Sequence, residues 1–174
     1  MGMRSNRGFT LIELMIAMGI AGILAAVAVP VFIESSARNA VWTASETIGS
    51  QIRQARLRAI SRNRSYEVRF DCPVAGQFRV LVVPGPDDVP PAPIDDDERC
   101  GISVMHEDGT TVLDGGTFAM PNSVTFGDVD TLTVSPRGIY TSAGVIPQTI
   151  TVTYGERQRT LTVSATGQIT FSDF

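Results

Sequence analysis

Glu13 is a carboxylate placed where a charge is costly. It lies in the apolar sequence Phe9-Thr-Leu-Ile-Glu-Leu-Met, at the start of a long uncharged segment. A carboxylate at the centre of a membrane-spanning helix costs about 2.5 to 3.5 kcal/mol on the insertion scales, and such residues usually have a partner. Near the end of the span the cost is smaller, but enclosure of the charge by other helices raises it again. We therefore expect Glu13 to take a cationic partner when its helix packs among others.

Cys72 and Cys100 are the only cysteines, and both follow the apolar segment. In an oxidising compartment they would pair, and closing a loop of about 29 residues stabilises a fold by about 3 to 4 kcal/mol in the chain-entropy model. The alternative is two unpaired thiols. A metal site is disfavoured, because the single histidine, His106, has no third thiol to complete a tetrahedral set.

The sequence lacks the residue sets that are typical of enzymes. It has no Ser-His-Asp order, no glycine loop of the kind that holds a phosphate, and one histidine. The acidic run at residues 95–98 could attract calcium, but it lacks the ligand spacing of a calcium loop. We expect no catalysis, no metal and no cofactor.

An element that crosses a membrane must carry Glu13. The segment from Leu14 to Ile33 is 20 residues long and has no charge, which is enough to cross the hydrocarbon core as a helix. It is longer than the core of a secretory signal, and no small-residue cleavage site follows it. Arg4 and Arg7 precede it, so we expect a cytoplasmic N-terminus and an exported C-terminal part.

Charge is distributed unevenly along the 174 residues. Residues 34–69 hold seven arginines and three glutamates, a net of +4, whereas residues 70–174 hold five arginines and fourteen acids, a net of −9; lysine is absent. Phosphate binding needs a cationic face. The acidic C-terminal part therefore argues against a nucleic-acid surface that covers the whole domain, but it does not exclude a small local patch.

A second helical segment follows the apolar one. Its apolar residues recur at steps of three and four, which predicts one buried face of an amphipathic helix: Val41, Ala44, Ile48, Ile52, Ala55 and Ala59. Arginines gather toward its end, where cations suit the helix dipole: Arg53, Arg56, Arg58, Arg62 and Arg64. We expect this cluster to be a solvated face, or else a contact with an acidic neighbouring subunit.

The rest of the chain alternates with a period of two, which is typical of strands. Residues 66–70 and 78–83 predict two strands, and five more are expected at Val124–Phe126, Thr131–Val134, Thr149–Tyr154, Thr160–Ser164 and Gln168–Phe171. The last three should form a meander whose core residues are Ile150, Val152, Leu161, Val163, Ile169 and Phe171. The proline- and aspartate-rich segment 84–97 predicts an exposed loop. A long helix followed by an antiparallel sheet is an α+β plan.

The N-terminal residues resemble the signal of type IV prepilins and pseudopilins. The match lies in Arg7-Gly8-Phe9-Thr10-Leu11-Ile12-Glu13-Leu14. The resemblance implies that prepilin peptidase cuts between Gly8 and Phe9 and methylates the Phe9 amine. It also implies that Glu13 pairs with the N-terminal amine of a neighbouring subunit, and that Pro30 lets the helix loosen during assembly. On this basis we divide the chain into a leader (1–8), a transmembrane and filament-core helix (9–33), an amphipathic half (34–64) and a β-rich extracytoplasmic head (65–174).

Later segments resemble the GspH/FimT group of minor pilins and pseudopilins. They are the helix end Gln54 to Asn63, the turn Ser135-Pro136-Arg137-Gly138, and the segment Val163 to Ile169. One position departs from many relatives, because Gln168 stands where they have arginine. Some members of the group bind DNA through basic residues near the C-terminus, and here only Arg157 and Arg159 are available for this. Nucleic acid is therefore not an expected partner.

Together these resemblances imply a minor pilin, a structural or priming subunit of a type IV pilus. The alternatives are a minor pseudopilin of a type II secretion system and a DNA-uptake receptor. The implied partners are other pilin or pseudopilin subunits, prepilin peptidase and an inner-membrane assembly platform. The implied location is the bacterial inner membrane, with a periplasmic head, and then the filament.

Overall fold

The computed structural model describes residues 9–90, 96–121, 124–127 and 129–172. The chain divides into two compact units, Met1–Ala37 and Arg38–Phe174, which we describe separately and call the N-terminal unit and the globular unit. The predicted leader, with Gly8, lies outside the described residues, and so does Asp95 of the acidic run.

One long helix, α1 (Leu11–Arg62), contains both helical segments predicted from the sequence. It continues through Pro30, which lies inside the helix. Its N-terminal part is long and apolar enough to cross a membrane. After Arg62 the backbone leaves the helix, and Asn63 takes a positive φ of 52°, a conformation that asparagine tolerates better than most residues.

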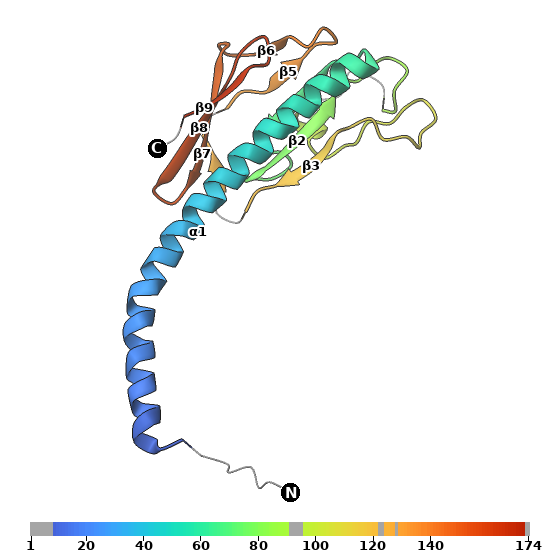
Figure 1. Ribbon diagram of the computed structural model, residues 1–174. Coiled ribbons are helices and arrows are strands. Elements are labelled where there is room, and N and C mark those ends of the chain that lie inside the picture. The colour runs from blue at the N-terminus through green and yellow to red at the C-terminus, as the bar shows by residue number, and fades with distance from the viewer. Residues whose placement is uncertain (1–8, 91–95, 122–123, 128, 173–174) are drawn as a thin grey trace, which may run out of the picture. The chain divides into compact units, whose positions relative to one another are not determined.

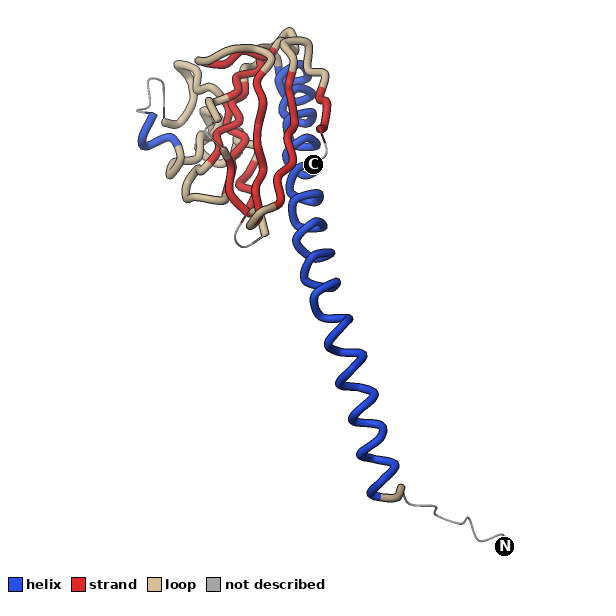
Figure 2. Tube along the Cα trace, turned by 90° about the vertical axis from the view of Figure 1, so that its left-hand side faces the viewer, coloured by secondary structure: helices blue, strands red, loops and turns tan. Residues whose placement is uncertain are grey.

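The predicted amphipathic face of α1 is confirmed. Its six apolar positions are all fully or almost fully buried: Val41, Ala44, Ile48, Ile52, Ala55 and Ala59. They pack with strand residues into one hydrophobic core within the globular unit (Figures 1 and 2). Tyr140, in the five-stranded sheet, joins that sheet to α1: its hydroxyl donates a hydrogen bond to the carbonyl of Ile52 at 2.6 Å. Burial raises the pKa of the Tyr140 phenol above its ordinary value.

The described strands form two antiparallel sheets. In chain order they are β1 (Tyr66–Phe70), β2 (Gln77–Val82), β3 (Gly116–Ala119), β4 (Val124–Phe126), β5 (Leu132–Val134), β6 (Tyr140–Ser142), β7 (Gln148–Tyr154), β8 (Arg157–Val163) and β9 (Ile169–Ser172). The five-stranded sheet has the order β3-β2-β1-β5-β6, and the four-stranded sheet has the order β4-β7-β8-β9. The chain is thus α+β, as predicted.

The C-terminal meander is also confirmed. Strand β7 pairs with β8, and β8 pairs with β9, in antiparallel register. Four of its six expected core residues are fully buried: Ile150, Val152, Leu161 and Val163. Ile169 and Phe171 are half-buried and pack against the core from β9, which is the edge strand of the four-stranded sheet in the described part of the chain.

Strand β2 departs from the predicted alternation. Both of its faces are buried: Leu81 is as inaccessible as the core residues Phe78 and Val80, and Arg79 is 7% exposed. The reason lies in the β2–β3 connection (residues 83–115), whose segment from Arg99 to Asp114 covers the second face: Arg79 donates to the carbonyls of Cys100 and Ile102 and lies 3.7 Å from Asp114. In the described part of the predicted exposed loop 84–97, Asp87 and Val89 are exposed, whereas Asp88 is buried. The described part of the connection also contains a short helix, α2 (Asp96–Arg99). Strands β3 and β6 were not predicted, because each has only three or four residues and too few apolar ones to show a period.

Arg56 joins the two turn segments that the sequence singled out. Gly138 and Gly167 have φ values of 76° and 81°, and a Cβ built on either would lie within about 3 Å of the Arg56 side chain. The Tyr140 backbone N–H donates to the carbonyl of Ala165 at 2.8 Å. These two glycine turns, one from each sheet, therefore meet on the same helical arginine.

Candidate functional site

The start of α1 is capped by the same residues that carry the prepilin resemblance. The backbone N–H of Glu13 donates to the hydroxyl of Thr10 at 3.3 Å, and the N–H of Leu14 donates to the carbonyl of Thr10 at 3.2 Å. Thr10 is thus the N-cap, and Glu13 occupies the third helical position, where glutamate is favoured by the capping box and the helix dipole. The sequence Thr-Leu-Ile-Glu has the residue types of a capping box at the right spacing, so this helix start could have been predicted from the sequence.

The N-terminal unit exposes its apolar side chains along its whole described length. Phe9 is 84% exposed, Phe32 is 75% exposed, and no described side chain from Phe9 to Ser36 is buried. A contiguous apolar surface of this size is stable only in lipid or against other helices. The N-terminal unit therefore has the chemistry of an anchor and of an assembly surface.

The arginines at the end of α1 are not simply a solvated face. Three of them are bound by the β2–β3 connection: Arg58 donates to the carbonyl of Gly115 at 3.0 Å, Arg62 to the carbonyl of Leu113 at 3.3 Å, and Arg64 to the carboxylate of Asp88. The hydrogen bond between Arg64 and Asp88 raises the pKa of the guanidinium and lowers that of the carboxyl. Arg53 remains exposed and Arg56 half-exposed.

The structure corrects the assignment of Arg159 as a candidate DNA contact. Its side chain is only 6% exposed, and it donates to the Ser45 hydroxyl at 3.0 Å and to the Glu46 carboxylate at 3.2 Å. Its guanidinium also lies 4.6 Å from the ring centre of Phe171. Arg157 is half-buried. Arg159 therefore joins β8 to α1 and β9, and it is not available to a phosphate.

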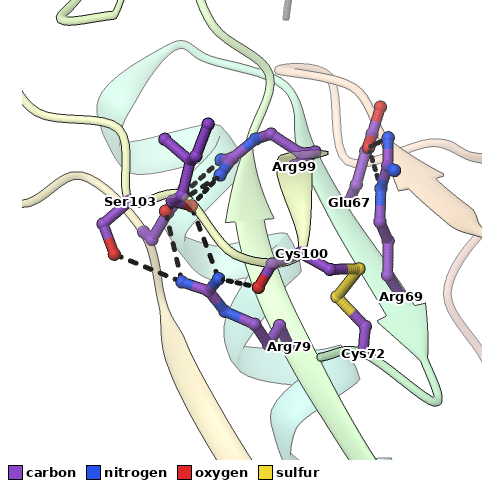
Figure 3. The surroundings of a disulfide bond; sticks show 9 residues. Glu67, Arg69, Cys72, Arg79, Arg99, Cys100 and Ser103 are labelled. Carbon is purple, nitrogen blue, oxygen red and sulfur yellow. Dashed lines mark hydrogen bonds and ion pairs between the residues drawn. A yellow bond between two sulfur atoms is a disulfide. The ribbon is translucent and has the colours of Figure 1, made fainter. Parts of the chain in front are cut away.

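A disulfide and a buried ion cluster hold the β2–β3 connection (Figure 3). Cys72 and Cys100 are bonded, as predicted, with their Cα atoms 5.3 Å apart. Beside them, the Asp114 carboxylate accepts from Arg99 at 2.5 and 3.1 Å and lies 3.7 Å from Arg79. Arg79 in turn donates to the carbonyl of Cys100 at 2.5 Å. The sequence showed the cysteines, but nothing in it indicated this cluster.

Burial decides the electrostatics of this cluster. The side chains of Asp114 and Arg99 are 2% and 3% exposed, and that of Arg79 is 8% exposed. Desolvation lowers the pKa of the Arg79 guanidinium, and the nearby Asp114 carboxylate opposes that effect. One carboxylate thus compensates two buried guanidinium groups.

Replacing both cysteines tests how much the covalent link contributes. The bridge spans 28 positions of sequence, so Cys72→Ser with Cys100→Ser should lower the unfolding free energy by about 3 to 4 kcal/mol. Urea unfolding of the full chain in detergent, followed by circular dichroism, measures this loss. Because the ion cluster still holds the connection, the variant should keep the native spectrum before unfolding. A change of less than about 1 kcal/mol would show that the cluster alone suffices.

Two family models match the chain in regions that agree with this geometry. The prokaryotic N-terminal methylation motif matches residues 3–29, and the type II transport protein GspH model matches residues 44–167, most of the globular unit. The chain belongs to the GspH family. Members of the GspH family are structural filament subunits, pilins and pseudopilins, and the apolar helix is the membrane anchor through which they enter the filament.

Individual relatives place the GspH-family chain among pilins. It is 29% identical to the pilin-like protein PilA1 of Thermus thermophilus over 168 residues, which cover 94% of this chain and 97% of that protein. It is 68% identical to the type IV major pilin PilA of Myxococcus xanthus, but only over 34 residues, 20% of this chain and 16% of that one. The type IV minor pilin FimU of Pseudomonas aeruginosa shares the fold, with a TM-score of 0.50 and 16% identity over 78% of this chain and 90% of that one.

Proposed function

We propose that the chain is a minor pilin, made as a prepilin and incorporated into a type IV pilus through the N-terminal part of α1. The observation that carries this proposal is the methylation motif at residues 3–29, which leads into an exposed apolar helix capped at Thr10. In the proposed processing, prepilin peptidase cuts between Gly8 and Phe9 and methylates the new amine. The inner membrane then holds the subunit, with the globular unit in the periplasm, until assembly. Neighbouring pilins and the assembly platform are its partners.

Cleavage places a cationic amine close to an anionic side chain. Phe9 would carry the amine four residues before Glu13, which lies in the first turn of α1. Within a bundle of apolar helices, an unpaired carboxylate is strongly disfavoured, and a paired one is tolerated. The amine of one subunit and Glu13 of the next can therefore select the axial register of neighbouring subunits.

The processing step is tested by mass spectrometry after co-expression with a prepilin peptidase. The native chain should lose residues 1–8 and gain one methyl group on Phe9. Gly8→Ala should keep the full mass, because the cleavage site is lost, whereas Gly2→Ala, a matched glycine change elsewhere in the leader, should be processed normally. Cleavage of the Gly8→Ala chain at the same bond would contradict the assignment.

A minor pseudopilin of a type II secretion system is the second candidate. It is favoured by the description of the family model, type II transport protein GspH. The two roles differ in their cellular effect, because a pilin gene deletion removes surface pili and twitching, whereas a pseudopilin deletion blocks protein secretion. We expect the first outcome, which agrees with Pro30 in α1 and with the match to PilA1 along nearly the whole chain. Normal piliation with lost secretion would favour the pseudopilin.

A further inference from the structure

Two exposed faces of the globular unit have opposite charge and similar apolar centres. The basic face lies on the end of α1 and on the β5–β6 turn, and its members are Arg53, Arg56, Leu57, Ile60, Arg137 and Ile139. The acidic face lies on the β2–β3 connection, and its members are Asp87, Val89, Glu107, Asp108 and Val112. We infer that the basic face of one copy binds the acidic face of a second copy within the filament, an inference that rests on the proposed filament role.

The basic face is continuous. Arg53, Leu57 and Ile60 follow one another at helical spacings of four and three, so they form one stripe. A Cβ on Gly138 would lie 2.9 Å from Ile60, which places the β5–β6 turn directly beside this stripe. Leu57 is 65% exposed, and Ile60 and Ile139 are each about half exposed. Large aliphatic side chains thus lie together on the surface.

The arginines of the basic face have no carboxylate partner among the residues that the structure describes. This holds for Arg53, Arg56 and Arg137, whereas Arg64, Arg79 and Arg99 all form ion pairs with aspartates. The Nε atom of Arg56 is moreover buried without a hydrogen-bond partner. Within the described part of the chain, the positive charge of this face is therefore compensated only by solvent. An acidic surface that binds here would form ion pairs that the isolated chain lacks.

The acidic face combines charged and aliphatic side chains in the same way as the basic face, but with the opposite charge. Asp87 and Glu107 line the same cleft, beside His106. Val89 and Val112 both pair with Met105 through single β-bridges, so the two exposed valines flank Met105, next to these acids. Asp87 and Glu107 form no ion pair in the described part of the chain, and each is free to meet a guanidinium.

One chain cannot bring its own two faces together. The β2–β3 connection is bound to the opposite flank of α1, through Arg58 and Arg62, and not to the stripe of Arg53 and Leu57. A contact between unlike faces of identical copies is heterologous, and it extends along a line of copies unless its rotation closes a ring. Such a contact allows runs of adjacent copies in a filament.

Charge exchange between two variants tests this contact in the full chain in detergent. Arg53→Glu with Arg137→Glu makes both faces acidic, and Asp87→Arg with Glu107→Arg makes both faces basic. Each variant alone should self-associate at least about tenfold more weakly than the native chain in sedimentation at low salt. Mixing the two should restore association, because every acidic face then meets a basic one. Glu156→Arg, an exposed reversal on the β7–β8 turn, is the control and should have no effect.

Salt provides the second readout. Raising the salt from about 50 mM to about 500 mM should weaken native association and abolish the rescue by mixing, because screening acts on exposed charges. Equal association of native chain and both variants, or a mixture no better than its components, would overturn the inference. So would binding of added DNA by the basic face while the copies stay monomeric. If mixing the two variants does not restore association but the leader is removed normally, only the proposed contact between copies is wrong. If the leader is not removed, the proposed function is wrong.

Discussion

Asp114→Ala should lower the unfolding free energy of the globular unit by about 3 to 5 kcal/mol, the largest loss of stability that we expect from one substitution. The Asp114 carboxylate compensates Arg79 and Arg99, both nearly inaccessible to water. It also accepts the backbone N–H groups of Val82 at 2.9 Å and Val104 at 3.0 Å. Alanine leaves two buried guanidinium groups without a compensating carboxylate, although both keep hydrogen bonds to backbone carbonyls. It also leaves the N–H groups of Val82 and Val104 without this acceptor, which adds to the cost.

Asp108 provides a matched control for this prediction. It too accepts two backbone N–H groups, those of Thr110 and Thr111 at 2.8 and 2.9 Å, but it is exposed to solvent. Asp108→Ala should therefore cause a far smaller loss, since water replaces the missing acceptor. Urea unfolding of the full chain in detergent compares the two variants. If they are equally stable, burial of the cluster is not what makes Asp114 important.

Glu13→Gln should lower incorporation into filaments by at least about tenfold while leaving membrane insertion intact. Glutamine retains the capping geometry at the third position of the helix, because both glutamate and glutamine serve there. It removes only the charge that would pair with the amine of a neighbouring subunit. Glu13→Ala removes both the charge and the polar side chain, although it keeps the backbone N–H that Thr10 caps, and Glu13→Asp retains the charge.

The measurement is the amount of each variant in sheared filaments relative to the amount in the membrane fraction. We expect the glutamine and alanine variants to be equally defective and the aspartate variant to keep part of its incorporation. A glutamine variant that assembles as well as the native chain, next to a defective alanine variant, would assign the role of Glu13 to the polarity of its side chain and not to its charge.

Local patterns in the sequence were sufficient for the parts of the fold that repeat regularly. The 3.6-residue period from Val41 to Ala59 predicted the buried face of α1, and the two-residue period from Ile150 to Phe171 predicted the meander. Strands β3 and β6 contain too few apolar residues to show a period, so they could not be recognised, although the equally short β4 and β5 were predicted. The two-residue alternation in β2 did not show that both faces of this strand are buried. The second face is covered by the β2–β3 connection, a contact that the residues of β2 alone do not indicate.

By itself, the sequence determined the membrane-spanning helix, the α+β plan and the resemblance at Gly8, Phe9 and Glu13, since each depends on residues close together in the chain or on composition. It left the two cysteines either paired or free, and the tertiary structure shows them bonded. Only the tertiary structure decided which charges are buried. It joined Asp114 to Arg79 and Arg99, took Arg159 out of solvent, and left Arg53 and Arg137 unpaired on the surface. Ion pairs between distant segments leave no local pattern, because their free energy depends on burial and distance, which exist only after folding.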